Sequence, residues 1–330
     1  MRLRAFWKKW GVSYLFAAPY VLLFLLFTVV PVLVAITLSF TSYNMLQPPV
    51  WVGWANYVKL LFADDVFLIA VKNTLLFAAI TGPLSYMLCL LLAWFINELK
   101  PTMRTILTLL FYAPSISGNV FMIWTILFSG DMYGWVNSVL IRWGIIYEPV
   151  RWLTDPDTLL WVTMLVTLWM SLGTSFLAFI AGLQGIDESL YEAGAIDGVR
   201  NRWQELWFIT LPAMRPQLLF GAIISITSSF AAGSHIVALV GFPSTDYAGH
   251  TVITHLMDYG NIRFEMGYAS AIATLLFVAM LLTQQLVQRH LSGLDSGHKL
   301  LQLRQGSLVT GGLIGRGLGY GGLGHGSNGA

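Results

Sequence analysis

Charged residues are scarce in this sequence: only 10% of its 330 residues are Asp, Glu, Lys or Arg, whereas 56% are hydrophobic. A soluble domain carries about 25% charged residues, which keep its surface in contact with water. The deficit therefore argues against a soluble enzyme, a nucleic-acid-binding protein and an intrinsically disordered chain. The net charge of +2 is also too small to attract nucleic acid. These exclusions leave a polytopic membrane protein.

Cysteine is nearly absent, and the patterns of metal-binding and nucleotide-binding sites are missing. The single cysteine, Cys89, excludes a disulfide within the chain and a cysteine-based metal cluster. The six histidines lack the spacing of metal ligands, and no phosphate-binding loop of the Walker A type occurs. We therefore expect no catalytic residue, no metal and no cofactor, and predict that the chain is not an enzyme.

Long apolar runs are what the sequence has instead. A helix needs about 20 apolar residues to cross the hydrocarbon core of a bilayer. Six runs are long enough: Tyr14–Phe40, Val71–Phe95, Thr105–Phe128, Leu159–Ala181, Leu218–Val240 and Gly267–Val287. None of them contains Asp or Glu, and Lys72 lies only at an edge. The runs predict an all-α protein with six transmembrane helices.

The positive charges predict how these helices are oriented. Cytoplasmic loops of membrane proteins carry an excess of Lys and Arg. With both termini placed in the cytoplasm, 13 of the 18 Lys and Arg residues lie inside and 5 lie in outer loops. The first run is too long for the apolar region of a signal peptide, and no cleavage pattern follows it, so we expect it to be retained.

Three regions follow from this topology. Residues 1–13 are expected to form a cytoplasmic segment, residues 14–290 the six-helix transmembrane domain, and residues 291–330 a disordered, glycine-rich cytoplasmic tail. Two outer loops are rich in aromatic residues, which fit either an interfacial belt or a docking surface for an external partner. They are Trp51, Trp54 and Tyr57 in the first loop and Trp135, Trp143, Tyr147 and Trp152 in the second.

The longest inner loop, residues 182–216, carries eight charged residues and a readable pattern. It predicts a short helix capped by Asp187 or Ser189, a turn at Gly198, and a second helix that ends at Pro212 and Pro216. On composition alone, an amphipathic helix lying on the membrane surface fits the loop as well.

The order of residues in this loop resembles the E-A-A…G…I-x-L-P loop of binding-protein-dependent ABC importer permeases. Tyr191 before the motif and Trp203 within it make the loop most similar to the carbohydrate-uptake branch. The resemblance implies the type I importer permease fold and a loop that couples to an ATPase. The residues that match, or lie within, the motif are Glu192, Ala193, Gly194, Asp197, Gly198, Ile209, Leu211 and Pro212.

The loop departs from the family pattern at two points. Gly194 stands where the family usually has Ala, which keeps the position small. Ten residues rather than nine separate Gly198 from Ile209, so the register of the second helix stays open.

The resemblance also implies partners and a location. The partners are a second homologous permease, cytoplasmic ABC ATPase subunits, an extracytoplasmic solute-binding protein, a sugar substrate and membrane lipid, with no nucleic acid. The location is the cytoplasmic membrane of a bacterium or archaeon, which the chain crosses several times.

Polar residues inside the spans are candidates for a substrate path. Sugars bind through hydrogen bonds and an aromatic face. The candidates are Thr167, Trp169, Ser171 and Thr174 in the fourth run, Ser225, Ser228, Ser229 and His235 in the fifth, and Asn119 near a predicted break in the third. Small polar residues also pack transmembrane helices together, and this alternative stays open for each of them.

The predicted function is therefore the permease subunit of an ABC importer for a sugar or oligosaccharide. Ion-coupled transporters usually carry an ionisable residue within a span, and none lies in the middle of these runs. An ion-coupled secondary transporter or channel remains an alternative. So does an ABC permease for a polyol, a glycerol phosphodiester or a peptide.

Overall fold

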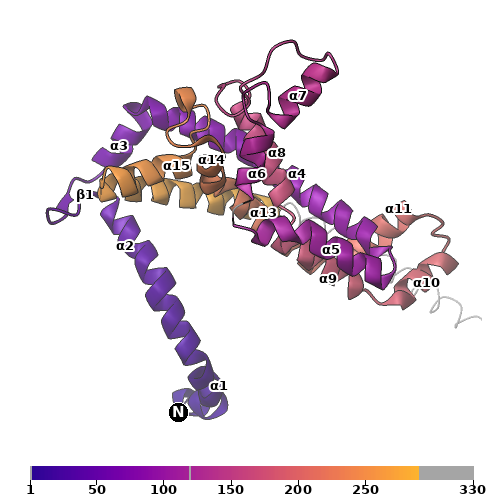
Figure 1. Ribbon diagram of the computed structural model, residues 1–330. Helices are drawn as coiled ribbons and strands as arrows, with labels where there is room; N and C mark the ends of the chain where they lie inside the picture. Colours follow the sequence, from indigo (N-terminus) through magenta and orange to yellow (C-terminus); the bar gives the residue numbers. More distant parts are fainter. Residues whose placement is uncertain (1, 119, 290–330) are drawn as a thin grey trace, which may run out of the picture. The chain divides into compact units, whose positions relative to one another are not determined.

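The protein is mostly helical in the computed structural model, which describes residues 2–118 and 120–289 (Figure 1). The α-helices are α1 (Arg2–Phe24), α2 (Val30–Leu38), α3 (Ala55–Phe62), α4 (Asp65–Asn97), α5 (Pro101–Ile116), α6 (Phe121–Leu127), α7 (Trp135–Arg142), α8 (Leu159–Met170), α9 (Thr174–Gln184), α10 (Glu188–Ile196), α11 (Arg202–Glu205), α12 (Leu211–Ala213), α13 (Arg215–Phe230), α14 (Gly233–Val240), α15 (Val252–Met257) and an unlabelled helix, Met266–Arg289.

Shorter elements complete the described chain. Three π-helical turns lie at Leu25–Val29, Leu206–Thr210 and Asp258–Ile262, and a 3₁₀ turn lies at Thr245–Tyr247. Strands β1 (Thr41–Ser42) and β2 (Val50–Trp51) pair antiparallel, with Thr41 opposite Trp51.

Four helical segments are long and apolar enough to cross a membrane: Gly11–Leu38, Asp65–Asn97, Leu159–Gln184 and Met266–Arg289. Two bent pairs of helices pass the same test when each pair is taken together. These are Pro101–Ile116 with Phe121–Leu127, bent by 88°, and Arg202–Ala213 with Arg215–Phe230, bent by 83°. The described part of the chain therefore has four to six candidate spans, which makes the protein a multi-pass membrane protein.

The third predicted run, Thr105–Phe128, is interrupted as expected. Helix α5 contains Pro114 and ends at Ile116, and α6 begins at Phe121. Proline removes a backbone donor from the ladder and favours such a break. The candidate Asn119 lies outside the described residues.

The fifth predicted run, Leu218–Val240, is wrong as a single helix. Helix α13 ends at Phe230, and Ala231 leaves the helical conformation (φ −91°, ψ 12°) before α14 starts at Gly233. A Cβ atom on Gly233 would collide with the side chain of Ile253 in α15. The break thus allows α14 to pack closely against a helix that follows it in the chain.

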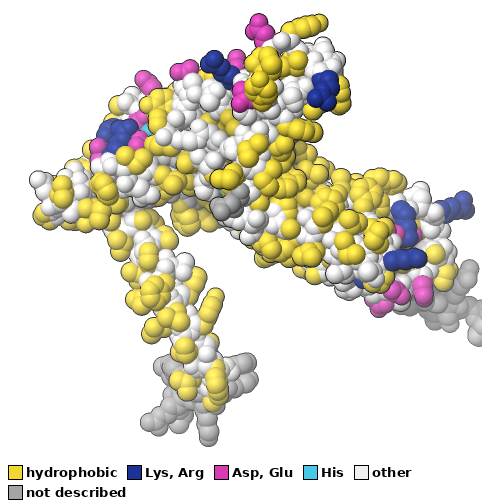
Figure 2. Space-filling model, in the orientation of Figure 1, with side chains coloured by type: hydrophobic (Ala, Val, Ile, Leu, Met, Phe, Trp, Pro, Cys, Tyr) yellow, Lys and Arg dark blue, Asp and Glu magenta, His cyan; other side chains and the backbone are white. Residues whose placement is uncertain are grey.

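A core of apolar side chains holds α4, α9 and α13 together. Phe179 of α9 is fully buried, and its ring lies so close to Gly221 of α13 that a Cβ atom there would collide with it. Tyr86 of α4 packs edge-on against Phe179, with ring centroids 5.4 Å apart. Figure 2 shows apolar side chains over α5 and α9, and charged side chains gathered over α10 and α11.

The chain divides into two units, residues 1–282 and 283–330. Of the second unit, the structure describes only residues 283–289, which end the last helix. The predicted glycine-rich tail, residues 291–330, lies outside the described residues.

Candidate functional site

The loop of residues 182–216, which the sequence places on the inner side, folds as two short helices joined by a turn. The side chain of Asp187 caps α10 by accepting a hydrogen bond from the backbone N–H of Ser189 (3.0 Å). Of the two expected caps, Asp187 is therefore the one in place. This cap satisfies a backbone donor that the first turn of a helix otherwise leaves free.

One face of α10 is exposed and combines charge with apolar surface. Glu192 and Ala193 are exposed, and the side chain of Ile196 is 87% exposed although it is apolar. An exposed carboxylate beside an uncovered aliphatic side chain is suited to contact another protein, since the carboxylate can pair with a basic group while Ile196 is buried.

Gly198 provides the turn after α10. Its φ is +93°, a conformation that other residues rarely adopt. The backbone N–H of Val199 donates to the carbonyl of Gly194 (2.9 Å), closing the end of the helix, and Asp197 is the exposed C-cap residue. Asn201 then caps α11 by accepting from the N–H of Gln204 (2.8 Å).

The opposite face of α10 packs on the π-helical turn Leu206–Thr210. The Tyr191 hydroxyl lies 3.0 Å from Oγ1 of Thr210, which is buried. A Cβ atom on Gly194 would lie 2.5 Å from Cδ1 of Ile209, so glycine leaves room for the tip of that side chain.

The ten residues between Gly198 and Ile209 are thus accommodated by a turn through residues 199–201, by α11 and by the π-helical turn. This arrangement defines the register that the sequence left open. Leu211 and Pro212 lie in α12, just before the chain bends by 83° into α13.

The second helix of the loop is attached to the end of α4. The guanidinium of Arg202 forms ion pairs with Glu98 and Glu205, both at 2.8 Å. The rings of Trp203 and Trp94 pack with centroids 5.1 Å apart. Between these helices lies a polar cavity of about 470 Å³, which Arg104, Arg202, Glu98, Glu188 and Glu205 border together with neighbouring residues.

Three of the six hydroxyl groups of the candidate substrate path donate to a carbonyl three or four residues earlier in the chain. Thr167 donates to the carbonyl of Thr163 (2.8 Å), Ser171 to Leu168 (2.7 Å) and Ser229 to Ile226 (2.8 Å). Thr174 and Ser228 are exposed. Ser225 and Ser229 are buried, and Ser229 lies beside Gly82 of α4, as a residue that packs helices would.

Trp169 and His235 differ from the other candidates because both meet aromatic rings of α6. The rings of Trp169 and Trp124 meet edge-on at 5.2 Å, and those of His235 and Phe121 lie 5.3 Å apart. The indole N–H of Trp124 and Nδ1 of His235 are buried without a hydrogen-bond partner in the structure. Two polar atoms beside aromatic faces are the groups with which a protein binds a sugar.

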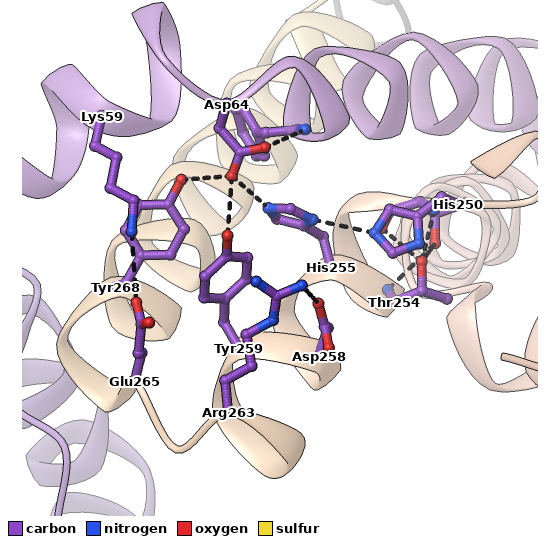
Figure 3. Close-up of polar contacts among 12 residues, drawn as sticks. Lys59, Asp64, His250, Thr254, His255, Asp258, Tyr259, Arg263, Glu265 and Tyr268 are labelled. Carbon is purple, nitrogen blue, oxygen red and sulfur yellow. Dashed lines mark hydrogen bonds and ion pairs between the residues drawn. The ribbon is translucent and has the colours of Figure 1, made fainter. Parts of the chain in front are cut away.

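A polar network that the sequence gave no reason to expect lies around Asp64, the N-cap of α4 (Figure 3). One carboxylate oxygen accepts from the N–H of Phe67 (3.0 Å), and the other accepts from the hydroxyl of Tyr268 (2.7 Å). The second oxygen also lies 3.1 Å from Nε2 of His255, whose Nδ1 is 3.0 Å from Nε2 of His250.

Ion pairs border this network. Arg263 pairs with Asp258 (2.7 Å), and Lys59 pairs with Glu265 (3.5 Å). The Lys59 ammonium also lies 4.4 Å from the centre of the Tyr268 ring. Asp64 and His255 are 191 residues apart. The only sequence signals were an Asp before an apolar run and two His five residues apart.

Burial decides the protonation of the network. Burial alone would raise the pKa of Asp64, but hydrogen bonds from Tyr268 and Phe67 and the proximity of His255 lower it. Burial lowers the pKa of His255 in spite of Asp64, and it lowers the pKa of His250 to about 4. At neutral pH the network therefore holds a charged Asp64 and two neutral imidazoles.

The aromatic residues of the outer loops have two different surroundings. Trp51, Trp54 and Tyr57 pack around Phe40, with ring centroids 5.0 to 5.6 Å apart. In the second loop, the side chains of Trp135, Trp143 and Tyr147 are exposed, whereas Trp152 donates its indole N–H to Asn137 (2.8 Å).

Asn137 organises the second outer loop from a fully buried position. Its amide donates to the carbonyls of Ser129 (3.1 Å), Asp131 (3.1 Å) and Val150 (3.0 Å), and its oxygen accepts from Val150 and Trp152.

No group of three or more His, Cys, Asp or Glu side chains placed to hold a metal ion occurs in the described part of the chain.

Comparison with known proteins identifies relatives along most of the chain. A family profile described as "Binding-protein-dependent transport system inner membrane component" matches residues 85–293. The arabinooligosaccharide transport permease AraP of Bacillus subtilis (strain 168) is 31% identical over 295 residues, which cover 88% of this chain and 92% of AraP. The probable ABC transporter permease YesP of the same strain is 32% identical over 81% of this chain and 85% of YesP.

A solved structure has the same fold. One chain of a bacterial ABC transporter involved in import of the acidic polysaccharide alginate superimposes with a TM-score of 0.69 and 26% identity. The match covers 88% of this chain and 99% of that chain.

Proposed function

The chain belongs to the family of binding-protein-dependent transport system inner membrane components, and we propose that it forms the path of an ABC importer for a sugar or oligosaccharide. It is a transport permease that crosses the membrane several times. The observation that carries the proposal is the exposed face of α10, where Glu192 and Ile196 are available to a cytoplasmic partner. We infer a carbohydrate substrate from relatives such as AraP, which is named for the transport of arabinooligosaccharides.

The topology proposed for this function has six spans and cytoplasmic termini. It counts each bent helix pair as one span. The distribution of Lys and Arg supports this orientation. In this arrangement residues 1–13 and 291–330 lie in the cytoplasm, residues 14–290 form the membrane domain, and residues 182–216 form the coupling loop.

The proposed partners are a second permease of the same family, ABC ATPase subunits inside, and a solute-binding protein outside. Glu192 would pair with a basic residue of the ATPase. Because Ala193 and Gly194 have no bulky side chains, α10 could pack closely in a groove of that subunit. The angle of the turn after α10 would depend on Asp197 and Gly198. The position of the second helix would depend on Ile209, Leu211 and Pro212. Closure of the ATPase dimer would then move the two coupling loops together and open the path outward.

For the substrate path, we infer that Trp169 and His235 contribute directly to binding. The support is their position beside Trp124 and Phe121 and the unpartnered polar atoms there. Thr167, Ser171, Thr174, Ser225, Ser228, Ser229 and Asn119 remain candidates whose alternative role is helix packing.

The experiment is uptake of a labelled oligosaccharide by proteoliposomes that contain this chain together with a partner permease, ABC ATPase subunits and a solute-binding protein. We expect uptake to require ATP and the binding protein. The Glu192→Lys variant should lose uptake and fail to retain the ATPase, because the replacement reverses the charge of the exposed carboxylate.

The matched control is Glu148→Lys, which makes the same charge change at an exposed position of the second outer loop. This variant should retain the ATPase. Uptake that follows an ion gradient and continues without ATP would overturn the proposal.

A further inference from the structure

We propose that Arg202 is a positioning residue that ties the coupling loop to α4, and that α4 carries the loop's movement to the outer network around Asp64. The inference rests on the proposed function, because it takes α10 to be the element that the ATPase moves.

Helix α10 is firmly joined to the segment that follows it. Tyr191 meets Thr210 by a hydrogen bond (3.0 Å), and Gly194 meets the tip of Ile209. Thr210 is buried, so this contact is shielded from water. A displacement of α10 therefore acts on the π-helical turn Leu206–Thr210.

The segment that contains α11 and the π-helical turn is in turn fixed to the inner end of α4 by three contacts of different kinds. Arg202 bridges Glu98 and Glu205, Trp203 packs on Trp94, and Leu206 is buried in the core cluster that contains Trp94. An isolated exposed ion pair holds its partners weakly. Here Glu205, in the same helix as Arg202, orients the guanidinium toward Glu98 (both ion pairs at 2.8 Å), and the packed pair of indoles adds a contact that does not depend on charge.

Helix α4 is suited to transmit a displacement because it is long and unbroken. Its 33 residues, Asp65–Asn97, correspond to about 50 Å at 1.5 Å per residue. Pro83 lies within it without ending it. The path through α8 and α9, in contrast, leaves the helical conformation at Gly173 (φ −111°, ψ −128°).

Polar contacts anchor both ends of α4. Glu98 is its C-cap and pairs with Arg202, whereas Asp64 is its N-cap and contacts His255 and Tyr268. His255 belongs to α15 and Tyr268 to the last helix. A shift of α4 along its axis therefore reaches both of these outer elements.

The test is a charge exchange in the assembled transporter, with its permease, ATPase and binding protein. The variants are Glu98→Arg, Arg202→Glu and the two together. Each single variant should retain the ATPase but lower uptake per ATP hydrolysed at least about fivefold. A fivefold change lies at the lower end of the effects that coupled sites in proteins have on each other. The double variant should recover most of this ratio, because the opposite charges again face each other.

Hydrogen exchange provides a second readout. In the wild type, addition of ATP should change exchange in residues 250–265, and this change should disappear in the single variants and return in the double variant. A merely structural role of Arg202 would lower the amount of assembled protein and leave the ratio and the exchange response unaltered.

The matched control is Arg200→Glu, an equal charge change at an exposed residue of the turn just before α11. This variant should leave the ratio of uptake to ATP hydrolysed unchanged. The inference is overturned if the single variants keep the wild-type ratio, if the double variant does not recover, or if Arg200→Glu has the same effect as Arg202→Glu. If the wild-type chain fails to retain the ATPase, the proposed function itself fails.

Discussion

Among single residues, Gly198 has the most specific conformational role in the coupling loop. Its φ of +93° would cost an L residue roughly 1–2 kcal/mol, and the turn would shift to relieve the strain. We predict that Gly198→Ala reduces uptake severalfold in proteoliposomes, because α10 then leaves its position relative to α11.

Gly144 in the second outer loop is the control, since it also has a positive φ (+71°) and nothing lies within 4 Å of where its Cβ would be. Gly144→Ala should bear a similar conformational cost and retain the ATPase. Equal loss of the ATPase from both variants would show that backbone strain in any loop is sufficient to release the ATPase, and that the role of Gly198 is not specific to the coupling loop.

The titratable residues around Asp64 predict a response to acid. His250 and His255 are held neutral in the folded chain, whereas in an opened segment they would take up protons below about pH 6.5. Asp64 adds to the effect at lower pH, because its charge is stabilised only in the folded network. Stability of the network should thus be complete above pH 6.5 and decline toward pH 4.

Hydrogen exchange at pH 7.5 and pH 5, corrected for the intrinsic rate, measures this decline. Protection should fall in residues 250–265 and stay constant in residues 129–152, which contain no histidine. The prediction is wrong if both segments respond alike. His250→Phe should weaken the response, because one of the two titrating imidazoles is gone.

The helix and the turn of the proposed coupling loop could be predicted from sequence, and the network around Asp64 could not, for a physical reason. Glu192 and Gly198 lie within one short motif, whose helix and turn form from neighbouring residues. Asp64 and His255 meet only because the start of α4 packs against α15 and the last helix, and no local pattern specifies a contact across 191 residues.

At the scale of helices, apolar runs located the candidate spans but missed two breaks, one at Gly173 in the fourth run and one at Ala231 in the fifth. The interruption of Thr105–Phe128 was predictable because Pro114 and Gly118 disfavour a continuous helix. The end of α13 at Phe230 was not, because Ala231 and Ala232 are good helix formers. Tertiary packing of Gly233 against Ile253 accompanies that break, and such packing is invisible in a hydropathy pattern.

The second outer loop should depend on Asn137 as a single unit. Asn137→Ala removes five hydrogen bonds to the loop, among them those that its amide donates to the carbonyls of Ser129, Asp131 and Val150. At about 1 kcal/mol each, with some replaced by water, the loss should destabilise the loop by about 2–4 kcal/mol. Hydrogen exchange in residues 129–152 should then rise by about 30-fold to 1,000-fold, since each 1.4 kcal/mol is a factor of ten.

Ser138→Ala is the neighbouring control, because the Ser138 hydroxyl bonds only to the carbonyl of Trp135 within the same helix. It should leave exchange close to that of the wild type. An unchanged loop in Asn137→Ala would mean that the apolar contacts of Trp152 with Phe128 hold the loop without the amide.

For the whole molecule, the single cysteine makes the proposed topology directly measurable. Cys89 is buried in α4 and can be replaced by alanine. In that background we predict that Tyr133→Cys reacts with a membrane-impermeant maleimide on intact cells. Ala193→Cys, on α10, should react only after the membrane is opened, in cells that lack the ATPase and so leave α10 uncovered.

Both positions are exposed in the structure, so a difference in labelling reports the side of the membrane rather than burial. Labelling of both cysteines from the same side would contradict the proposed topology, since it would place the coupling loop and the second outer loop together.

The segment Gly11–Leu38 buries none of its most apolar stretch against the rest of the described chain. Its insertion into a bilayer therefore needs no contact with helices that are synthesised later. During translation, this segment can enter the lipid and stay there while the ribosome completes the remaining spans. The order of synthesis would thus provide a membrane anchor before the packed core of α4, α9 and α13 exists.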